Sequence, residues 1–297
     1  MNFKIGIDGG GTKTEFILTD AAGVIIDRRL DRGCNPSLLL PEEVDRIIRG
    51  NLQALLESSR EQYPEVVITH TLMGMAGSPL FWRDFAARLD GFGAVQTHDD
   101  SIAVLELATG GAPGLVLHAG TGSFIAARSA DGAAHFAGGL GWRFGDPGSA
   151  YDLGRRVVAR AILELQGWAE PSRMGRTVVD ITGCRDAATL TRRFYTDTAA
   201  NTALAEFAPH VTAAAEEEDL VAVNLISQSV TELAHLARSV IQRLFAQADK
   251  LPVGLSGAIL QTAAARTALV QTLGHHCILQ PITDPPIEGI RRLLARL

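Results

Sequence analysis

Short apolar runs separated by glycine or polar turns open the chain. Phe3–Asp8, Thr14–Thr19 and Val24–Arg29 have the length of strands, and they are joined by a triple glycine and by a polar turn at residues 20–23. Apolar segments of this length bounded by turn residues are typical of β-strands. The order predicts an antiparallel meander, whereas a dinucleotide-binding or P-loop domain would pass from its first glycine-rich turn directly into a helix.

A helical pattern follows at Pro41–Ser59, where the apolar residues fall on one stripe. Strands and helices then alternate, with strands at Val66–Met73 and Gly93–Thr97 and helices at Phe81–Leu89 and Ser101–Leu107. These elements predict an α/β domain over residues 1–113, closed by a linker of glycine, alanine and proline.

The second half repeats the opening order of the first. A strand at Gly114–His118, a tight turn at Gly120–Ser123 and a return strand at Phe124–Arg128 are followed by another polar turn. The repeat indicates duplication of one α/β unit. A mostly helical region over residues 149–251, a strand at residues 253–258 and a final helix near residue 286 complete a predicted domain over residues 114–297 with a helical insertion.

The composition is that of a globular protein, with 46% hydrophobic and 20% charged residues in 297. A net charge of -6 argues against nucleic acid or an anionic membrane as the main partner. No signal peptide is recognised, and the apolar stretches are broken short of the roughly 20 residues that a membrane span needs. Three scattered cysteines indicate free thiols, so we expect a cytoplasmic protein.

The triple glycine is the first candidate for chemistry. Consecutive glycines cost conformational entropy on folding, and close approach of backbone amides to a phosphate would offset that cost. The segment supplies Gly9, Gly10, Gly11, Thr12 and Lys13 as candidate phosphate-binding residues. The alternative is an ordinary hairpin turn.

Asp8, at the end of the first strand, is a candidate Mg²⁺ ligand that would act through water. Gly120-Thr121-Gly122 repeats the glycine and threonine pattern at the equivalent place in the second half, which predicts two phosphate loops facing across a cleft.

Asp99 lies where a strand ends and a helix begins, followed directly by Asp100. A carboxylate there is a suitable general base for a sugar hydroxyl, because the helix N-terminus stabilises its charge. The alternative is a helix cap at Asp99 with a solvated Asp100. The glycine-rich loop at Gly138–Ser149 carries Arg143 and Asp146, which indicates a polyol-binding edge, or otherwise a surface Ω-loop.

Together these motifs resemble the BadF/BadG/BcrA/BcrD ATPase family of the actin, Hsp70 and sugar-kinase superfamily, and most closely its N-acetylglucosamine and glucosamine kinases. The resemblance runs in order along the whole chain. Besides the two turns and the Asp99 segment, it includes Cys34-Asn35-Pro36, Gly74-Met75-Ala76-Gly77, the loop from Gly138 to Tyr151, Leu255-Ser256-Gly257-Ala258 and Pro285-Pro286-Ile287-Glu288-Gly289.

The resemblance implies duplicated RNase H-like (actin-like ATPase) domains with an interdomain cleft that closes on ATP and Mg²⁺. Thr12 would contact the phosphates from one side, and Thr121 with Gly122 from the other. The implied adenosine-binding residues are Gly257, Ala258 and Ala215. The implied sugar-binding residues are Asn35, Gly77, Asp99, Leu140, Gly141 and Asp146, with Asp99 deprotonating a hydroxyl, O6 by expectation, in line with the γ-phosphate. A homodimer is also expected.

Three departures from the family pattern bear on the sugar. The loop reads Gly-Leu-Gly-Trp-Arg where the family shows Gly-Trp-Gly, Pro147 replaces a common glutamate, and His98 stands where Asn or Thr is frequent. The expected function is ATP-dependent phosphorylation of N-acetylglucosamine, glucosamine or a close relative. The alternatives are an iron–sulfur ATPase that activates a 2-hydroxyacyl-CoA dehydratase, which the solitary cysteines disfavour, and a non-catalytic sugar sensor.

Overall fold

The computed structural model describes residues 2–297, apart from the side chain of Gln62, and it divides into two compact units. The first unit joins Met1–Gly111 to Thr283–Leu297, and the second spans Ala112–Ile282. The domain boundary predicted between residues 113 and 114 lies close to the observed one between Gly111 and Ala112. Its assignment of the C-terminal helix to the second domain is wrong, because that helix packs on the sheet of the first unit.

The first unit contains one five-stranded sheet in the order β3-β2-β1-β4-β5. The strand β1 is antiparallel to β2 and parallel to β4, and β4 is parallel to β5. Its elements are β1 (Asn2–Gly9), β2 (Lys13–Asp20), β3 (Ile25–Arg32), α1 (Pro41–Gln62), β4 (Val67–Met75), α2 (Pro79–Ala86), β5 (Ala94–Asp99), α3 (Ser101–Thr109) and α11 (Pro286–Leu294).

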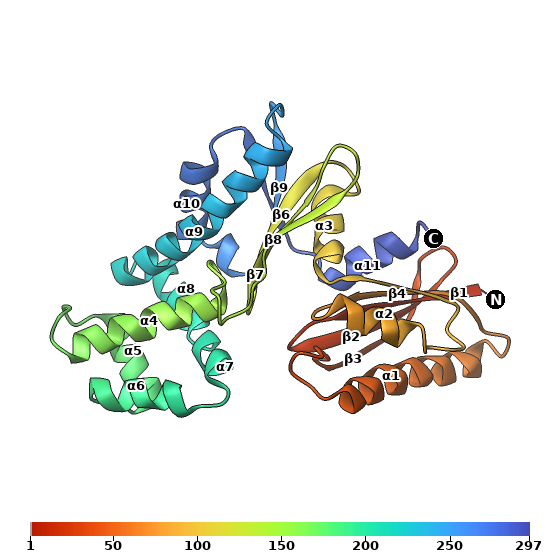
Figure 1. Cartoon of the computed structure of the whole chain (residues 1–297), viewed down its shortest axis with the longest axis horizontal. Helices are drawn as coiled ribbons and strands as arrows, with labels where there is room; N and C mark the ends of the chain where they lie inside the picture. Colours follow the sequence, from red (N-terminus) through yellow and green to blue (C-terminus); the bar gives the residue numbers. More distant parts are fainter. Residues whose placement is uncertain (1) are drawn as a thin grey trace. The chain divides into compact units, whose positions relative to one another are not determined.

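Helices cover both faces of this sheet (Figure 1). The helices α1 and α2 bury one face, and α3 and α11 bury the other. Glycines explain why α11 packs here: a Cβ at Gly6 would lie 2.9 Å from Cγ2 of Ile290, and one at Gly74 would lie 2.7 Å from its Cδ1. The sheet therefore carries no side chain at the two positions where the helix approaches it.

The second unit repeats the strand order of the first. Its sheet runs β10-β9-β6-β7-β8, with β6 antiparallel to β7 and parallel to β9. A hairpin meander is thus extended in both units by two parallel strands, which confirms the duplication. The elements of the unit are β6 (Gly114–Ala119), β7 (Ser123–Arg128), β8 (Ala134–Gly138), α4 (Ala150–Leu165), α5 (Arg173–Thr182), α6 (Ala187–Thr196), α7 (Ala200–Ala205), α8 (Ala208–Glu216), α9 (Leu220–Leu244), β9 (Leu251–Ser256), the 3-10 helix η1 (Ile259–Gln261), α10 (Ala263–Leu273) and β10 (Cys277–Ile282).

The helical insertion runs from α4 to α9, between β8 and β9. Among the described residues, α9 alone is long and apolar enough to cross a membrane by length and composition, which the sequence reading did not recognise. One face of α9, including Ile226, Val230 and Leu233, is buried in the core of the second unit. Packing against α10, α8 and α4 accounts for its apolar composition.

Candidate functional site

The turn between β1 and β2 presents free amides. The amide of Gly10 donates to the carbonyl of Lys13 at 2.9 Å, and the amide of Gly33 donates to the carbonyl of Thr12 at 2.9 Å. The amides of Gly11 and Thr12 form no hydrogen bond within the described residues, and both residues are exposed. A turn that is held rigidly while two amides remain free is suited to binding an anion.

Gly33 is a part of this turn that the sequence reading missed. A Cβ at Gly33 would collide with the carbonyl group of Gly11, so only glycine lets the chain after β3 pass so close. The amide of Cys34 then donates to the carbonyl of Gly10 at 3.2 Å. The signal in the sequence was a glycine directly after the third strand.

The turn between β6 and β7 has the same construction in the second unit. The amide of Gly120 donates to the carbonyl of Gly122 at 2.9 Å, and within the described residues the amides of Thr121 and Gly122 donate to no group. The first amides of α4 fix the turn from the other side: Ala150 donates to the carbonyl of Gly120 and Tyr151 to that of Thr121. Both units therefore present two free amides and a threonine hydroxyl.

Gly257 follows β9 and lies beside this second turn. Its φ of 100° favours glycine, and a Cβ there would collide with the carbonyl oxygen of Ala119 at the end of β6. Ala258 is exposed next to it. Ala215 lies in α8, partly buried against the core, and no described contact connects it with Gly257 or Ala258.

His118 packs under the second turn and was not singled out from the sequence. Its Nδ1 lies 3.0 Å from Oγ of Ser256, and its ring stacks on Phe124 with the ring centres 4.7 Å apart. Burial lowers the pKa of His118 to about 4, so the imidazole is neutral at physiological pH. A Cβ at Gly120 would lie 2.9 Å from its Nε2, which makes the residue a support for the turn.

The glycine-rich loop at residues 138–149 is tied to the second turn. Asp146 is 5% exposed, its Oδ1 accepts from the amide of Gly141 at 3.2 Å, and a Cβ at Gly122 would lie 3.0 Å from its Oδ2. Burial raises the pKa of Asp146, although the Gly141 amide opposes the shift. Oγ of Ser123 donates to the carbonyl of Pro147 at 2.7 Å. The loop is thus bonded in place beside the turn, unlike a loose surface connection.

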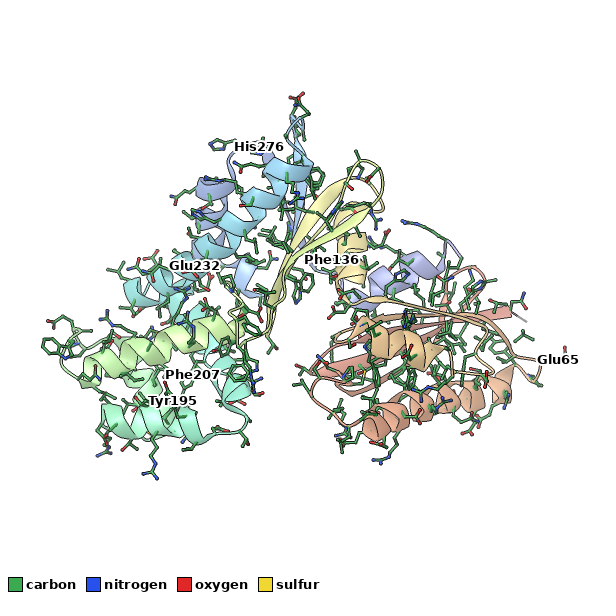
Figure 2. The ribbon with its side chains drawn as sticks, in the orientation of Figure 1. Glu65, Phe136, Tyr195, Phe207, Glu232 and His276 are labelled. Atoms are coloured by element: carbon green, nitrogen blue, oxygen red, sulfur yellow. The ribbon has the colours of Figure 1, made fainter. Side chains whose placement is uncertain are left out.

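Aromatic side chains accompany this loop. Trp142 is 40% exposed, meets Tyr151 edge to face at 5.9 Å, and carries the guanidinium of Arg143 at 5.2 Å from its ring centre. Leu140 is exposed on the same loop, and Phe136 is exposed on the neighbouring edge strand β8 (Figure 2). Exposed aromatic faces bind the apolar faces of sugar rings, which agrees with the predicted polyol-binding edge.

Asp8 lies at the end of β1 in the first unit. It is 7% exposed, and its carboxyl group has no hydrogen bond or ion pair within the described residues. Burial raises its pKa to about 7, Lys13 opposes the shift, and Glu15 adds to it. Lys13 itself lies 3.7 Å from Glu15, which also pairs with Arg28 at 2.8 Å.

The two adjacent carboxyl groups at the end of β5, those of Asp99 and Asp100, differ in their surroundings. Oδ1 of Asp99 accepts from the amide of Ser101 at 3.1 Å and also from its hydroxyl. The N-cap residue of α3 is Asp100, so the alternative prediction of an N-cap at Asp99 is wrong by one residue. The carboxyl group of Asp99 also shares a hydrogen bond with the side chain of Asp100. Asp100 is not simply solvated: burial raises its pKa to about 7, and the charges of Asp99 and Asp8 add to the shift.

Asn35 and Gly77 are brought together in the first unit, as their shared prediction as sugar-binding residues requires. Gly77 has a φ of 98°, and a Cβ there would lie 2.5 Å from Oδ1 of Asn35. That oxygen accepts from the amide of Ser37 at 2.8 Å, which fixes the side chain and leaves its amide group without a described partner. Asn35 can therefore donate to a hydroxyl or carbonyl oxygen of a ligand.

A divalent cation fits the surroundings of Asp8. A buried carboxylate without a partner is costly, and a cation would supply the missing charge. The described residues contain no cluster of three or more His, Cys, Asp or Glu side chains that could hold a metal. Mg²⁺ needs no such cluster, since it is usually bound by one or two carboxylates together with phosphate oxygens and water.

Asp8→Asn is expected to stabilise the metal-free protein at pH 8 but not at pH 4. Burial raises the pKa of Asp8 from 3.8 to about 7, so the folded protein retains a proton that the unfolded chain loses between these values. Wild-type stability therefore falls as the pH rises through this window, by up to about 4 kcal/mol from this group. Calorimetric melts without metal at both pH values measure the difference. A change in Tm that is equal at pH 4 and pH 8 would contradict the expectation.

Comparison with known proteins bears on these observations. Residues 5–291 match the model of the BadF/BadG/BcrA/BcrD ATPase family. An N-acetylmuramic acid/N-acetylglucosamine kinase of Clostridium acetobutylicum is 22% identical over 263 residues, which cover 88% of this chain and 86% of that protein. Among solved structures, a candidate N-acetylglucosamine kinase of Chromobacterium violaceum is 27% identical with a TM-score of 0.79 and 98% of both chains covered. A similar candidate from Porphyromonas gingivalis, 19% identical with 99% of both chains covered, shares the fold with a TM-score of 0.74.

Proposed function

The chain belongs to the BadF/BadG/BcrA/BcrD ATPase family, and on that premise we propose that it is a sugar kinase. The enzyme transfers the γ-phosphoryl group of ATP to N-acetylglucosamine, glucosamine or a close relative such as N-acetylmuramic acid. The relative at 22% identity is described as an N-acetylmuramic acid/N-acetylglucosamine kinase and the one at 27% as a candidate N-acetylglucosamine kinase, which supports the choice of substrate class.

The observation that carries the proposal is the pair of equivalent turns. Each leaves two adjacent backbone amides unbonded and places an exposed threonine hydroxyl beside them, Thr12 in one unit and Thr121 in the other. Phosphate oxygens accept hydrogen bonds from such amides, and the fixed dipoles need no rearrangement when charge builds up during transfer. We infer that both turns bind the phosphates of ATP, while Gly257 and Ala258 contact the adenosine.

Asp99 is the proposed general base. Ser101 fixes Oδ1 and so orients the carboxylate, and we assign Oδ2 as the oxygen that accepts the proton of the attacking hydroxyl. Asn35 and Gly77 bind the sugar in this unit, and the loop that carries Asp146 binds it in the other. Mg²⁺ held by Asp8, directly or through water, would neutralise charge on the phosphate oxygens.

The rival function, an iron–sulfur activator, receives no support from the cysteines. Cys34, Cys184 and Cys277 are all buried and free. Burial raises the pKa of Cys34 to about 11, so its thiol is a poor metal ligand at neutral pH. A cluster bridged between subunits would need accessible thiolates.

A coupled assay of ADP release over a panel of amino and neutral sugars tests the function. We expect ADP formation that depends on an amino sugar and is at least tenfold faster than without it, because a bound sugar must displace water from the site. ATP hydrolysis at the same rate with and without every sugar would contradict the proposal. A brown, oxygen-sensitive preparation would favour the activator instead.

A further inference from the structure

Asp99 and Asp100 are adjacent carboxylates at the end of β5, and the strand register assigns them to opposite faces of the first sheet. In the strand register, Asp8 pairs with Gly74 and Gly74 with His98, while Gly9 pairs with Met75 and Met75 with Asp99. Side chains of residues paired across neighbouring strands lie on the same face, and successive residues alternate. Asp99 therefore belongs to the face of Met75, and Asp8 to the opposite face.

The opposite face is the one that α11 covers. A Cβ at Gly74 would point at Ile290 of α11, which fixes the face on which Asp8 lies. Asp100 begins the turn into α3, and α3 packs against α11 on this same face. Asp8 and Asp99 are the neighbouring charges that act on Asp100. Asp100 is thus placed beside Asp8 and not only beside its neighbour in sequence.

The protein supplies this pair of carboxyl groups with few partners, and those of Asp100 are its neighbours in sequence. Asp8 is more than nine-tenths buried and has no described hydrogen bond or ion pair. Asp100 is the N-cap residue of α3, but its side chain makes no capping hydrogen bond and, among the described residues, bonds only with its neighbours, the side chain of Asp99 and the backbone of Ser101. The cation that acts on Asp8 is Lys13, whose side chain is 53% exposed and pairs with Glu15. A deeply buried carboxyl group without a partner, beside a second one that is bonded only to its neighbours in sequence, forms a ligand pair for a small hard cation.

We propose that Asp100 joins Asp8 in holding the divalent cation that accompanies the nucleotide, directly or through ordered water. This inference rests on the proposed nucleotide site, but it does not depend on which sugar is phosphorylated. Nucleotide phosphates and water complete the coordination, since two carboxylates are the usual protein contribution to such a site. Asp99 is then left free for the hydroxyl of the acceptor.

Binding of Mn²⁺ in place of Mg²⁺, followed by electron paramagnetic resonance, tests the inference on the full-length protein with a non-hydrolysable ATP analogue. Asp100→Asn is expected to raise the dissociation constant of Mn²⁺ about tenfold, as is Asp8→Asn. Asp99→Asn should leave it within twofold of wild type. Asp90→Asn is the matched control, because Asp90 is an exposed acid of the same unit and its substitution removes the same charge.

Unchanged Mn²⁺ affinity in Asp100→Asn would overturn the inference. A loss of turnover in Asp100→Asn with unchanged metal binding would also overturn it, since Asp100 would then be the general base. Circular dichroism checks that the variants fold, and Asp100→Ala, with a smaller side chain, replaces Asp100→Asn if that variant does not. A wild-type protein that shows the expected metal pattern but phosphorylates no sugar would refute the sugar kinase and leave the metal site standing.

Discussion

Asp99→Asn is expected to lower kcat about 10³-fold while nucleotide affinity stays within twofold of wild type. An amide cannot accept the proton of the attacking hydroxyl, and general-base catalysis contributes roughly 10²–10⁴-fold. The amide oxygen can still accept from the amide and hydroxyl of Ser101, so the start of α3 should remain intact. Sugar-dependent ADP release and fluorescence titration with a labelled nucleotide measure the two quantities.

Ser101→Ala is the companion variant for Asp99. It removes the hydroxyl that orients the carboxylate and keeps the amide, so it should cost about tenfold in kcat and leave the base present. Turnover of Asp99→Asn within tenfold of wild type would show that Asp99 is not the general base, and Asp100 would then be the next candidate.

Gly257→Ala is expected to lower the free energy of unfolding by about 3 kcal/mol or more. The position combines a φ of 100° with a collision between the new Cβ and the carbonyl oxygen of Ala119. A side chain at such a φ costs roughly 1 kcal/mol, and moving β9 from β6 adds the loss of buried packing. The displaced strand end lies beside the second turn, so nucleotide affinity should fall as well.

Gly167→Ala separates these two causes. Gly167 has a φ of 81° and nothing within 4 Å of the position that its Cβ would take, so it carries the backbone strain alone. Urea unfolding should show a loss of about 1 kcal/mol there. Equal losses in both variants would mean that the close contact with Ala119 is not important for stability.

The elements that could be predicted from the sequence are those with a strong local pattern. The opening meander, the helix predicted at Pro41–Ser59 and both glycine turns show such patterns, and each was predicted within a few residues of its observed position. The strands β8 and β10 were missed because β8 has only five residues, three of them alanine or glycine, and β10 contains Pro281. Both are edge strands, and pairing with a neighbour decides their conformation.

Other features depend on contacts that no local pattern records. The amphipathic pattern of α11 shows that one of its faces is buried but not which sheet it covers. The absence of side chains at Gly6 and Gly74 lets α11 pack on the sheet of the first unit. The support of the second turn by His118 and Ser256 joins residues 138 positions apart. Local sequence likewise could not separate Asp99 from Asp100, since the difference comes from the opposite faces of a sheet. The roles assigned to Ala215 and to a homodimer stay predictions.

The central claim is that the equivalent turns of both units hold the phosphates of one nucleotide. Amide chemical shifts during titration of isotope-labelled protein with a non-hydrolysable ATP analogue and Mg²⁺ test it most directly. The account predicts that the amide signals of Gly11, Thr12, Thr121 and Gly122 all shift with a single dissociation constant. The amide signals of Gly91 and Gly167, which serve as controls, should not shift. Shifts confined to one turn, or two different dissociation constants, would contradict it.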